Sequence, residues 1–276
     1  MKRLSLILLC LAQFFLCWAQ NIEKIKRDSS YIWAEGVGDT MEDADADAMQ
    51  QLVSQISVWV QHEMGVSVKE RSGSEGYSSR QEVQDKTHAV SAAQLNGARS
   101  IPISPEGPAR VFRYISHRAV EEMMEQRRER ILSLVQTGKK AEERLQIDDA
   151  LRNYYWALVL AGNVPKEPEV EFTGEKGIAS TVLPTKIKAV LSQISGVITN
   201  ITHEGGVKCA DVFFTYAGKP VASLQYKFFD GQSYVGPVRV HDGHSQVDIQ
   251  SSVKDNLKIT FELRFKQEGS PAKFRV

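Results

Sequence analysis

Three aspartates that alternate with alanine have a spacing that could bind a cation. Asp43, Asp45 and Asp47 are similar to the first ligands of a calcium loop, but such a loop also needs a glycine at its sixth position and a closing glutamate in an irregular backbone. The alanines between them continue a helical pattern instead. On a helix, acids two residues apart point in different directions. We therefore interpret the three as acidic residues at a helix start.

Two histidines that are close in sequence are a second possible metal pair. In His241-Asp242-Gly243-His244 the Asp-Gly step indicates a two-residue hairpin turn, and the sequence places no further cluster of ligands beside it. His203-Glu204 lacks the second histidine that a zinc-protease helix needs. We therefore predict a hairpin at residues 241–244 and no metal site.

A pair of glycines follows a predicted strand and precedes a predicted helix. Gly36-Val37-Gly38 would suit a dinucleotide site, but Met41 stands where the third glycine belongs. The chain also lacks a G-x-S-x-G nucleophile elbow and a phosphate-cradling loop. We predict no converging group of acids, bases or nucleophiles, and therefore a protein that is not an enzyme and uses no cofactor.

Consecutive aromatic residues, Tyr154-Tyr155-Trp156, are the remaining candidates. Three neighbours on a helix cannot share one buried face, so at least one should project into a groove or against a neighbouring domain. Packing between domains is the simpler interpretation. The alternative interpretation is that Tyr155 and Trp156 are anchor residues that bind a protein partner.

The first 19 residues predict export. Lys2 and Arg3 give a positive start, Leu4 to Trp18 is almost entirely apolar, and Cys17-Trp18-Ala19 places small residues at the two positions that a signal peptidase reads. The apolar run is short for a membrane span. We predict cleavage after Ala19 and a periplasmic or extracellular location.

Lipidation of the leader is not expected, because Leu9 precedes Cys10 and Leu16 precedes Cys17 where a small residue is needed. The mature chain then keeps Cys209 alone, so it forms no internal disulfide. The whole chain has zero net charge, and loss of Lys2 and Arg3 leaves −2. Nothing in this balance indicates a nucleic-acid surface.

The elements predict an α+β multidomain protein. Residues 31–38 form a strand, Thr40 caps a helix, and the apolar stripe from Ala44 to Val60 has helical spacing. Further strands at 66–68, 98–103 and 111–115 complete a helix on an antiparallel sheet.

The rest of the chain divides into a helical and a β-rich part. Helix-forming residues run from Ala119 to Gln136, and we expect Gly138 to break the helix before a second one ends near Gly162. After a linker with a short helix at 184–192, alternating strands and turns predict an antiparallel β-sandwich. The predicted boundaries are 1–19 for the leader, 20–117 for the α+β domain and 118–164 for the helical hairpin. The linker covers 165–193, and the β-sandwich covers 194–276.

Residues 31–62, with the G-x-G exit, spaced alanines and the apolar run Ile56-Ser57-Val58-Trp59-Val60, resemble the LPP-twenty type of bacterial envelope lipoprotein domain, and Leu95-Asn96-Gly97-Ala98 fits its later strand. The resemblance implies a small α+β envelope module and brings no catalytic residues with it. The helical pair resembles one tetratricopeptide-like unit. The β-rich end is similar to immunoglobulin- or transthyretin-like sandwiches.

Together these features predict an exported, non-enzymatic cell-envelope protein that acts as an interaction or scaffold module. Its partners would be other envelope proteins, with peripheral association to the outer membrane and no nucleic acid. The alternative is a periplasmic protein that binds a glycan or another small ligand with the sandwich loops around residues 241–244.

Overall fold

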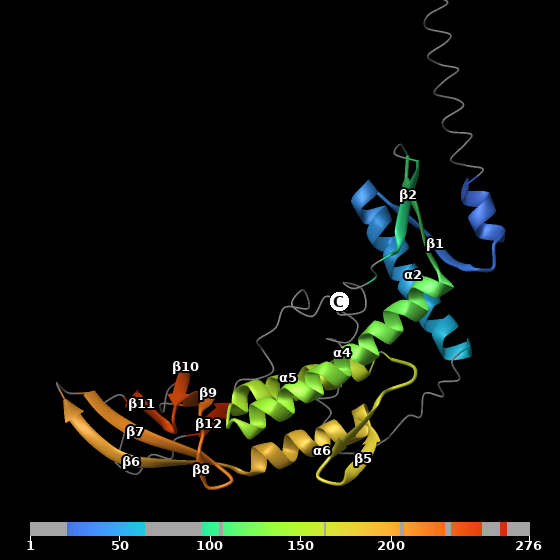
Figure 1. Ribbon diagram of the computed structural model, residues 1–276. Coiled ribbons are helices and arrows are strands. Elements are labelled where there is room, and N and C mark those ends of the chain that lie inside the picture. Colours follow the sequence, from blue (N-terminus) through green and yellow to red (C-terminus); the bar gives the residue numbers. More distant parts are fainter. Residues whose placement is uncertain are drawn as a thin grey trace, which may run out of the picture. The chain divides into compact units, whose positions relative to one another are not determined.

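The computed structural model describes residues 21–63, 95, 97–104, 107–162, 164–204, 207–229, 233–249 and 260–263 (Figure 1). It confirms the predicted α+β fold, which forms two compact units, residues 1–126 and 127–276. The predicted leader and the predicted strand at 66–68 lie outside the described residues. Within the described part, none of the helices combines the length and the apolar character that crossing a bilayer requires.

The first unit is a three-stranded antiparallel sheet with a helix on one face. Its strands are β1 (Tyr31–Gly38), β2 (Arg99–Ser104) and β3 (Ala109–Ser116), in the order β1-β3-β2. Helix α2 (Met41–Glu63) buries Ala44, Ala48, Leu52 and Ile56, which follow one another at four-residue spacing. The hydroxyl of Thr40 accepts a hydrogen bond from the amide of Asp43 at 3.1 Å, which confirms the predicted N-cap.

The two glycines of β1 allow the helix to approach the strand. A Cβ at Gly38 would lie 2.5 Å from the amide nitrogen of Ala44, and one at Gly36 would overlap the carbonyl oxygen of the same residue. Because Ala44 and Ala48 are also small, the backbones of α2 and β1 come together directly. The G-x-G pattern therefore serves helix–strand packing.

The opposite face of this sheet carries aromatic side chains. Residues 21–27 are helical and place Ile22 and Ile25 against Phe112. Trp33 stacks on Phe112 with ring centroids 5.8 Å apart. The ammonium of Lys26 bonds the carboxylate of Glu35 at 2.6 Å, so a charge pair also joins this segment to β1.

Helix α4 (His117–Glu143) is longer than the sequence predicts, because Gly138 does not break it. A Cβ at Gly138 would lie 2.5 Å from the Tyr154 ring. The glycine therefore gives Tyr154 room to pack, and the helix ends instead at the turn around Leu145, whose φ is +59°. Helix α5 (Ile147–Ala161) follows at once.

The predicted linker contains more structure than expected. It forms a hairpin of β4 (Glu169–Phe172) and β5 (Glu175–Ile178), and α6 then runs over Ala179–Ser192 with Pro184 inside it. The helix begins five residues before the predicted start. Ala179, Val182 and Leu183 are buried, so packing extends the helix. The carboxylate of Glu167 accepts a hydrogen bond from the amide of Ser180 in its first turn at 2.7 Å.

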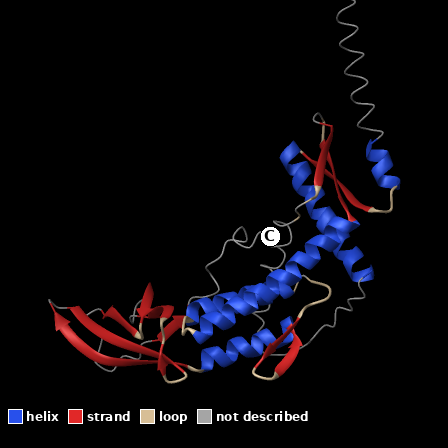
Figure 2. Ribbon diagram, viewed as in Figure 1, coloured by secondary structure: helices blue, strands red, loops and turns tan. Residues whose placement is uncertain are grey.

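The C-terminal part consists of strands (Figure 2). They pair antiparallel, as predicted. Its strands are β6 (Ile194–Glu204), β7 (Val207–Tyr216), β8 (Lys219–Pro220), β9 (Ser223–Phe229), β10 (Tyr234–His241), β11 (His244–Ile249) and β12 (Thr260–Leu263).

The strand order β12-β9-β10-β11-β7-β6 forms two halves that meet at one residue pair, His241 and His244. Phe214 from one half and Tyr226 from the other bring their rings within 4.9 Å. The sheet therefore folds on itself around an apolar core.

Candidate functional site

Three titratable side chains from three different elements meet at the carboxylate of Glu142. Glu142 near the end of α4 accepts hydrogen bonds from Lys186 of α6 at 2.7 Å and from the hydroxyl of Tyr216 of β7 at 2.6 Å, both on Oε1. Its Oε2 accepts one from the hydroxyl of Tyr154 of α5 at 2.7 Å. We call these four residues the Glu142 cluster. Hydrogen bonds to an ionised group are about twice as strong as neutral ones.

Local structure brings the four groups together. The short turn around Leu145 folds α5 back along α4, and the gap at Gly138 admits the Tyr154 ring. That ring meets Phe172 of the β4–β5 hairpin edge-on, with centroids 5.3 Å apart. Tyr216 is the last residue of β7, so the cluster joins three helices to the C-terminal sheet.

The electrostatics of the cluster hold the carboxyl of Glu142 and the two tyrosine hydroxyls in their ordinary protonation states. Burial opposes the charge of Glu142, but the bonds from Lys186, Tyr216 and Tyr154 outweigh it and keep the pKa of the carboxyl below its usual value. Burial, followed by the bond to Glu142, raises the pKa of Tyr154 and of Tyr216. The carboxylate stays charged and both hydroxyls stay protonated across the physiological range.

The prediction that no titratable groups converge is wrong for this cluster. Proton-transfer catalysis needs a pKa near the working pH, whereas the shifts at Glu142, Tyr154 and Tyr216 all move away from neutrality. The arrangement can hold elements together and set a local potential. The partners Lys186 and Tyr216 lie 44 and 74 residues from Glu142, and no sequence pattern pointed to them.

A cavity of about 450 Å³ adjoins the cluster. Its walls include Leu145, Thr173 and Ala217, which have φ of +59°, +49° and +50°. Non-glycine residues rarely adopt this conformation, and Asp242 is the fourth that the structure describes. Three tight turns therefore shape the cavity.

Lysine and phenylalanine side chains line the same cavity. The ammonium groups of Lys139 and Lys186 lie 4.9 Å and 5.4 Å from the centroid of the Phe172 ring, a cation–π distance. Lys219 and Glu143 also line it, and both are exposed.

A second candidate region is the outer strand of the C-terminal sheet. Among the described strands, β6 pairs with β7 alone. Residues 195–201, which we call the β6 edge, are all exposed, and Val197, Ile198 and Ile201 have 52%, 41% and 47% of their surface exposed. From 194 to 203 the sequence contains no Lys, Arg, Asp, Glu or Pro. Soluble proteins usually protect sheet edges with such residues. Here a β-bulge between Ile198 and Asn200 interrupts the pairing with β7.

The three aspartates of α2 have structural partners, which confirms their interpretation as residues of a helix start. Asp43 accepts a bond from the Thr40 hydroxyl at 2.7 Å, and Asp47 accepts one from the amide of Val37 at 3.0 Å. The guanidinium of Arg113 on β3 bonds Asp45 at 2.8 Å and lowers the pKa of that carboxyl. The sequence did not indicate this last pair.

The hairpin predicted at residues 241–244 is confirmed. Asp242 and Gly243 have φ of +49° and +84°, as a two-residue turn between antiparallel strands requires. The His244 ring lies against Phe213 with centroids 4.8 Å apart. Among the described residues, no three His, Cys, Asp or Glu side chains are placed to hold a metal ion.

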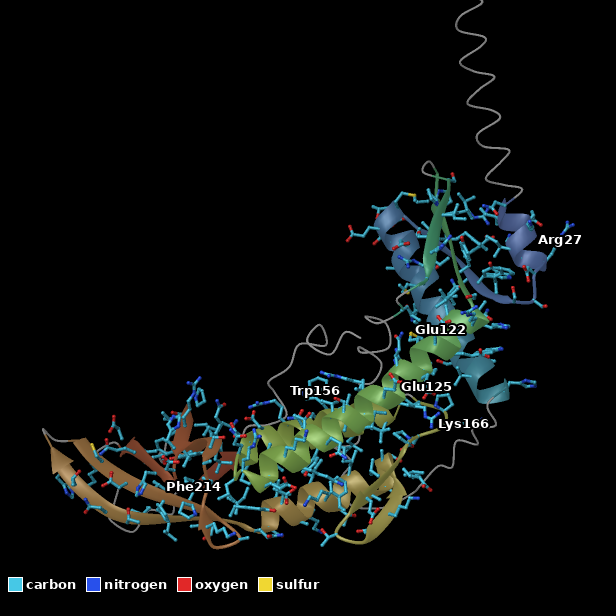
Figure 3. The ribbon with its side chains drawn as sticks, in the orientation of Figure 1. Arg27, Glu122, Glu125, Trp156, Lys166 and Phe214 are labelled. Atoms are coloured by element: carbon cyan, nitrogen blue, oxygen red, sulfur yellow. The ribbon has the colours of Figure 1, made fainter. Side chains whose placement is uncertain are left out.

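All three consecutive aromatics of α5 are buried, so none of them projects into an open groove as the partner-binding interpretation requires. Tyr154 is fully buried, and Tyr155 and Trp156 are each 2% exposed. Figure 3 labels Trp156 among the side chains of the structure. Eleven of the fifteen residues of α5 are buried, so this helix packs on every side. Tyr155 and Trp156 therefore belong to the core of the second unit and offer no surface to a partner.

Comparison of the chain with protein-family models, with curated proteins and with solved structures finds no match in any of the three. The resemblance of residues 31–62 to the LPP-twenty type stays a prediction.

Proposed function

We propose that this chain is an exported, non-enzymatic cell-envelope protein that binds an extended segment of another envelope protein along the β6 edge. The observation that carries the proposal is the exposure of residues 195–201 on an outer strand without charge or proline. An added strand would pair its main chain with β6, while Val197, Ile198 and Ile201 would contact its side chains.

The second unit is built to hold this edge firmly. Besides the bond from Tyr216 to Glu142, the hydroxyl of Ser223 donates to Asp148 at the start of α5 at 2.6 Å. The amide of Ala222 donates to the carbonyl of Leu145 at 2.8 Å. A sheet attached to helices at several points presents a pre-ordered edge, so less conformational entropy is lost on binding.

The non-enzymatic part of the proposal rests on the Glu142 cluster. Its pKa shifts favour fixed charges over proton exchange, so this convergence of titratable groups suits a structural role. Export rests on the predicted leader. Material purified from the envelope should begin at Gln20, and a chain that keeps residues 1–19 would contradict it.

Site-specific photo-crosslinking in intact cells tests the β6 edge. A photoreactive residue at Val197 or Ile201 should give a crosslink to another envelope protein, mapped by mass spectrometry to one segment. Leu132, which is 42% exposed on α4, is the matched apolar control and should give none. Replacement of both positions by lysine (Val197→Lys with Ile201→Lys) should abolish the complex, because a charged edge disfavours strand pairing. Leu132→Lys should keep it.

Sedimentation of the purified chain separates two kinds of occupant. A monomer that forms the mapped complex supports the proposal. A dimer that Val197→Lys with Ile201→Lys dissolves would show that a second copy occupies the edge, and would overturn the proposal of a different partner. Crosslinks from Val197 and Ile201 that are no stronger than those from Leu132 would also overturn the proposal.

A further inference from the structure

We propose that the cavity beside the Glu142 cluster binds a small anion, a carboxylate or a phosphate, through Lys139 and Lys219. This site is separate from the β6 edge, and its test does not depend on the partner proposed there. The cavity is lined by three lysines and two glutamates. Their formal charges leave an excess of one positive charge.

Two of the three lysines are left to face the cavity's contents, against the one exposed carboxylate of Glu143. The carboxylate of Glu142 already accepts hydrogen bonds from Lys186, Tyr154 and Tyr216, so its charge is compensated. In the described part of the chain, neither Lys139 nor Lys219 has a carboxylate within ion-pair distance. These two amines outnumber the carboxylate of Glu143, so the potential of the cavity is positive.

The same geometry disfavours other ligand classes. A sugar would need an open aromatic face, but the ammonium groups of Lys139 and Lys186 already lie over the Phe172 ring. A cation would meet an excess of positive charge in the lining. An anion would contact ammonium donors, for which charge-assisted bonds are strong.

The walls of the cavity are already in place. The carbonyl of Leu145 accepts a hydrogen bond from the amide of Ala222 at 2.8 Å. The amide of Ala217 donates one to the main-chain carbonyl of Gln193 at 3.1 Å. The turn at Thr173 closes the β4–β5 hairpin. The volume of the cavity, about 450 Å³, lies within the range of small-ligand sites, which are mostly preformed.

Calorimetric titration of the mature chain tests the site, with inorganic phosphate in one arm and succinate in the other, at constant ionic strength. Saturable binding is expected in at least one arm. The double variant Lys139→Gln with Lys219→Gln should weaken the affinity for the anion by about tenfold or more. The loss of one charge-assisted contact is already worth about a factor of ten. Lys140→Gln, next to Lys139 on the same helix and outside the cavity, is the matched control and should bind as the unchanged chain does.

The outcomes separate clearly. Binding in the phosphate arm alone, or in the succinate arm alone, supports the site and names its ligand class. Binding that the double variant leaves unchanged, or that Lys140→Gln weakens equally, would show a diffuse charge effect and overturn the proposal. No saturable binding at millimolar concentration would also overturn it. None of these results bears on crosslinking at the β6 edge.

Discussion

The Glu142 cluster supports a prediction that can be worked through in detail. Glu142→Gln keeps the size of the side chain but removes its charge. The two oxygens accept three hydrogen bonds, from Lys186, Tyr216 and Tyr154. A glutamine keeps only one oxygen acceptor. Its NH2 group is itself a donor and would face a group that donates to Glu142 in the unchanged chain. Bonds to charged groups contribute about 1.5–3 kcal/mol each.

The expected loss is about 3 kcal/mol in the free energy of unfolding. Removal of one partner of a buried ion pair costs about 3–5 kcal/mol, and the side chains of Lys186 and Glu142 are 16% and 17% exposed, which places the effect toward the lower end. Glu143→Gln, one residue later and exposed, is the control and should change stability by less than about 0.5 kcal/mol.

The pH dependence follows from the direction of the shift. The folded-state pKa of Glu142 lies below its ordinary value of 4.5. Its contribution is therefore fully present above the unfolded pKa and is lost as the pH falls through the folded one. The stability difference between the unchanged chain and Glu142→Gln should be constant from pH 7 to about pH 5 and should shrink below about pH 4.5.

Urea unfolding followed by tryptophan fluorescence measures this difference. Phenylalanine in place of Trp33 and Trp59 leaves Trp156 as the reporter of the second unit in the mature chain. With a slope of about 2 kcal/mol per molar urea, the midpoint should fall by about 1.5 M at pH 7. Equal midpoints at pH 7, or a difference that persists undiminished at pH 3, would refute the role assigned to Glu142.

Three further substitutions test the packing by urea unfolding. Gly36→Ala should destabilise the first unit by about 3 kcal/mol, because the added methyl overlaps the backbone of Ala44; a neutral effect would contradict the close approach of α2 and β1. Gly138→Ala should destabilise the second unit by about 2 kcal/mol despite the better helix propensity of alanine, since Tyr154 occupies the space; a stabilised variant would show that the ring moves. Trp156→Ala should cost about 3–5 kcal/mol, and an unchanged stability would restore it as a surface anchor.

Local pattern in the sequence predicted much of the fold. The four-residue spacing of Ala44, Ala48, Leu52 and Ile56 specifies the buried face of α2, because a helix brings such residues to one side. The Asp-Gly step predicted the turn before His244. The absence of charge on the β6 edge could also have been noticed, since it is a property of consecutive residues.

Gly138 and the aromatics of α5 show where local pattern fails. A glycine disfavours a helix by about 1 kcal/mol, but the packing of Tyr154 over Gly138 outweighs that cost and α4 continues. Three consecutive aromatics cannot be buried on one face, yet all are buried because α5 is packed on every side. The sequence does not state how many neighbours an element will have.

The sequence alone determined the class of most elements and the chemistry of several turns, because periodicity and turn preference act between residues a few positions apart. It did not predict the β4–β5 hairpin. Only the tertiary structure decided which side chains meet. Glu142 reaches Lys186 and Tyr216 across 44 and 74 residues, and the cavity beside them exists because three turns from separate hairpins dock together. Such convergence depends on the packing of whole elements, which no local pattern encodes.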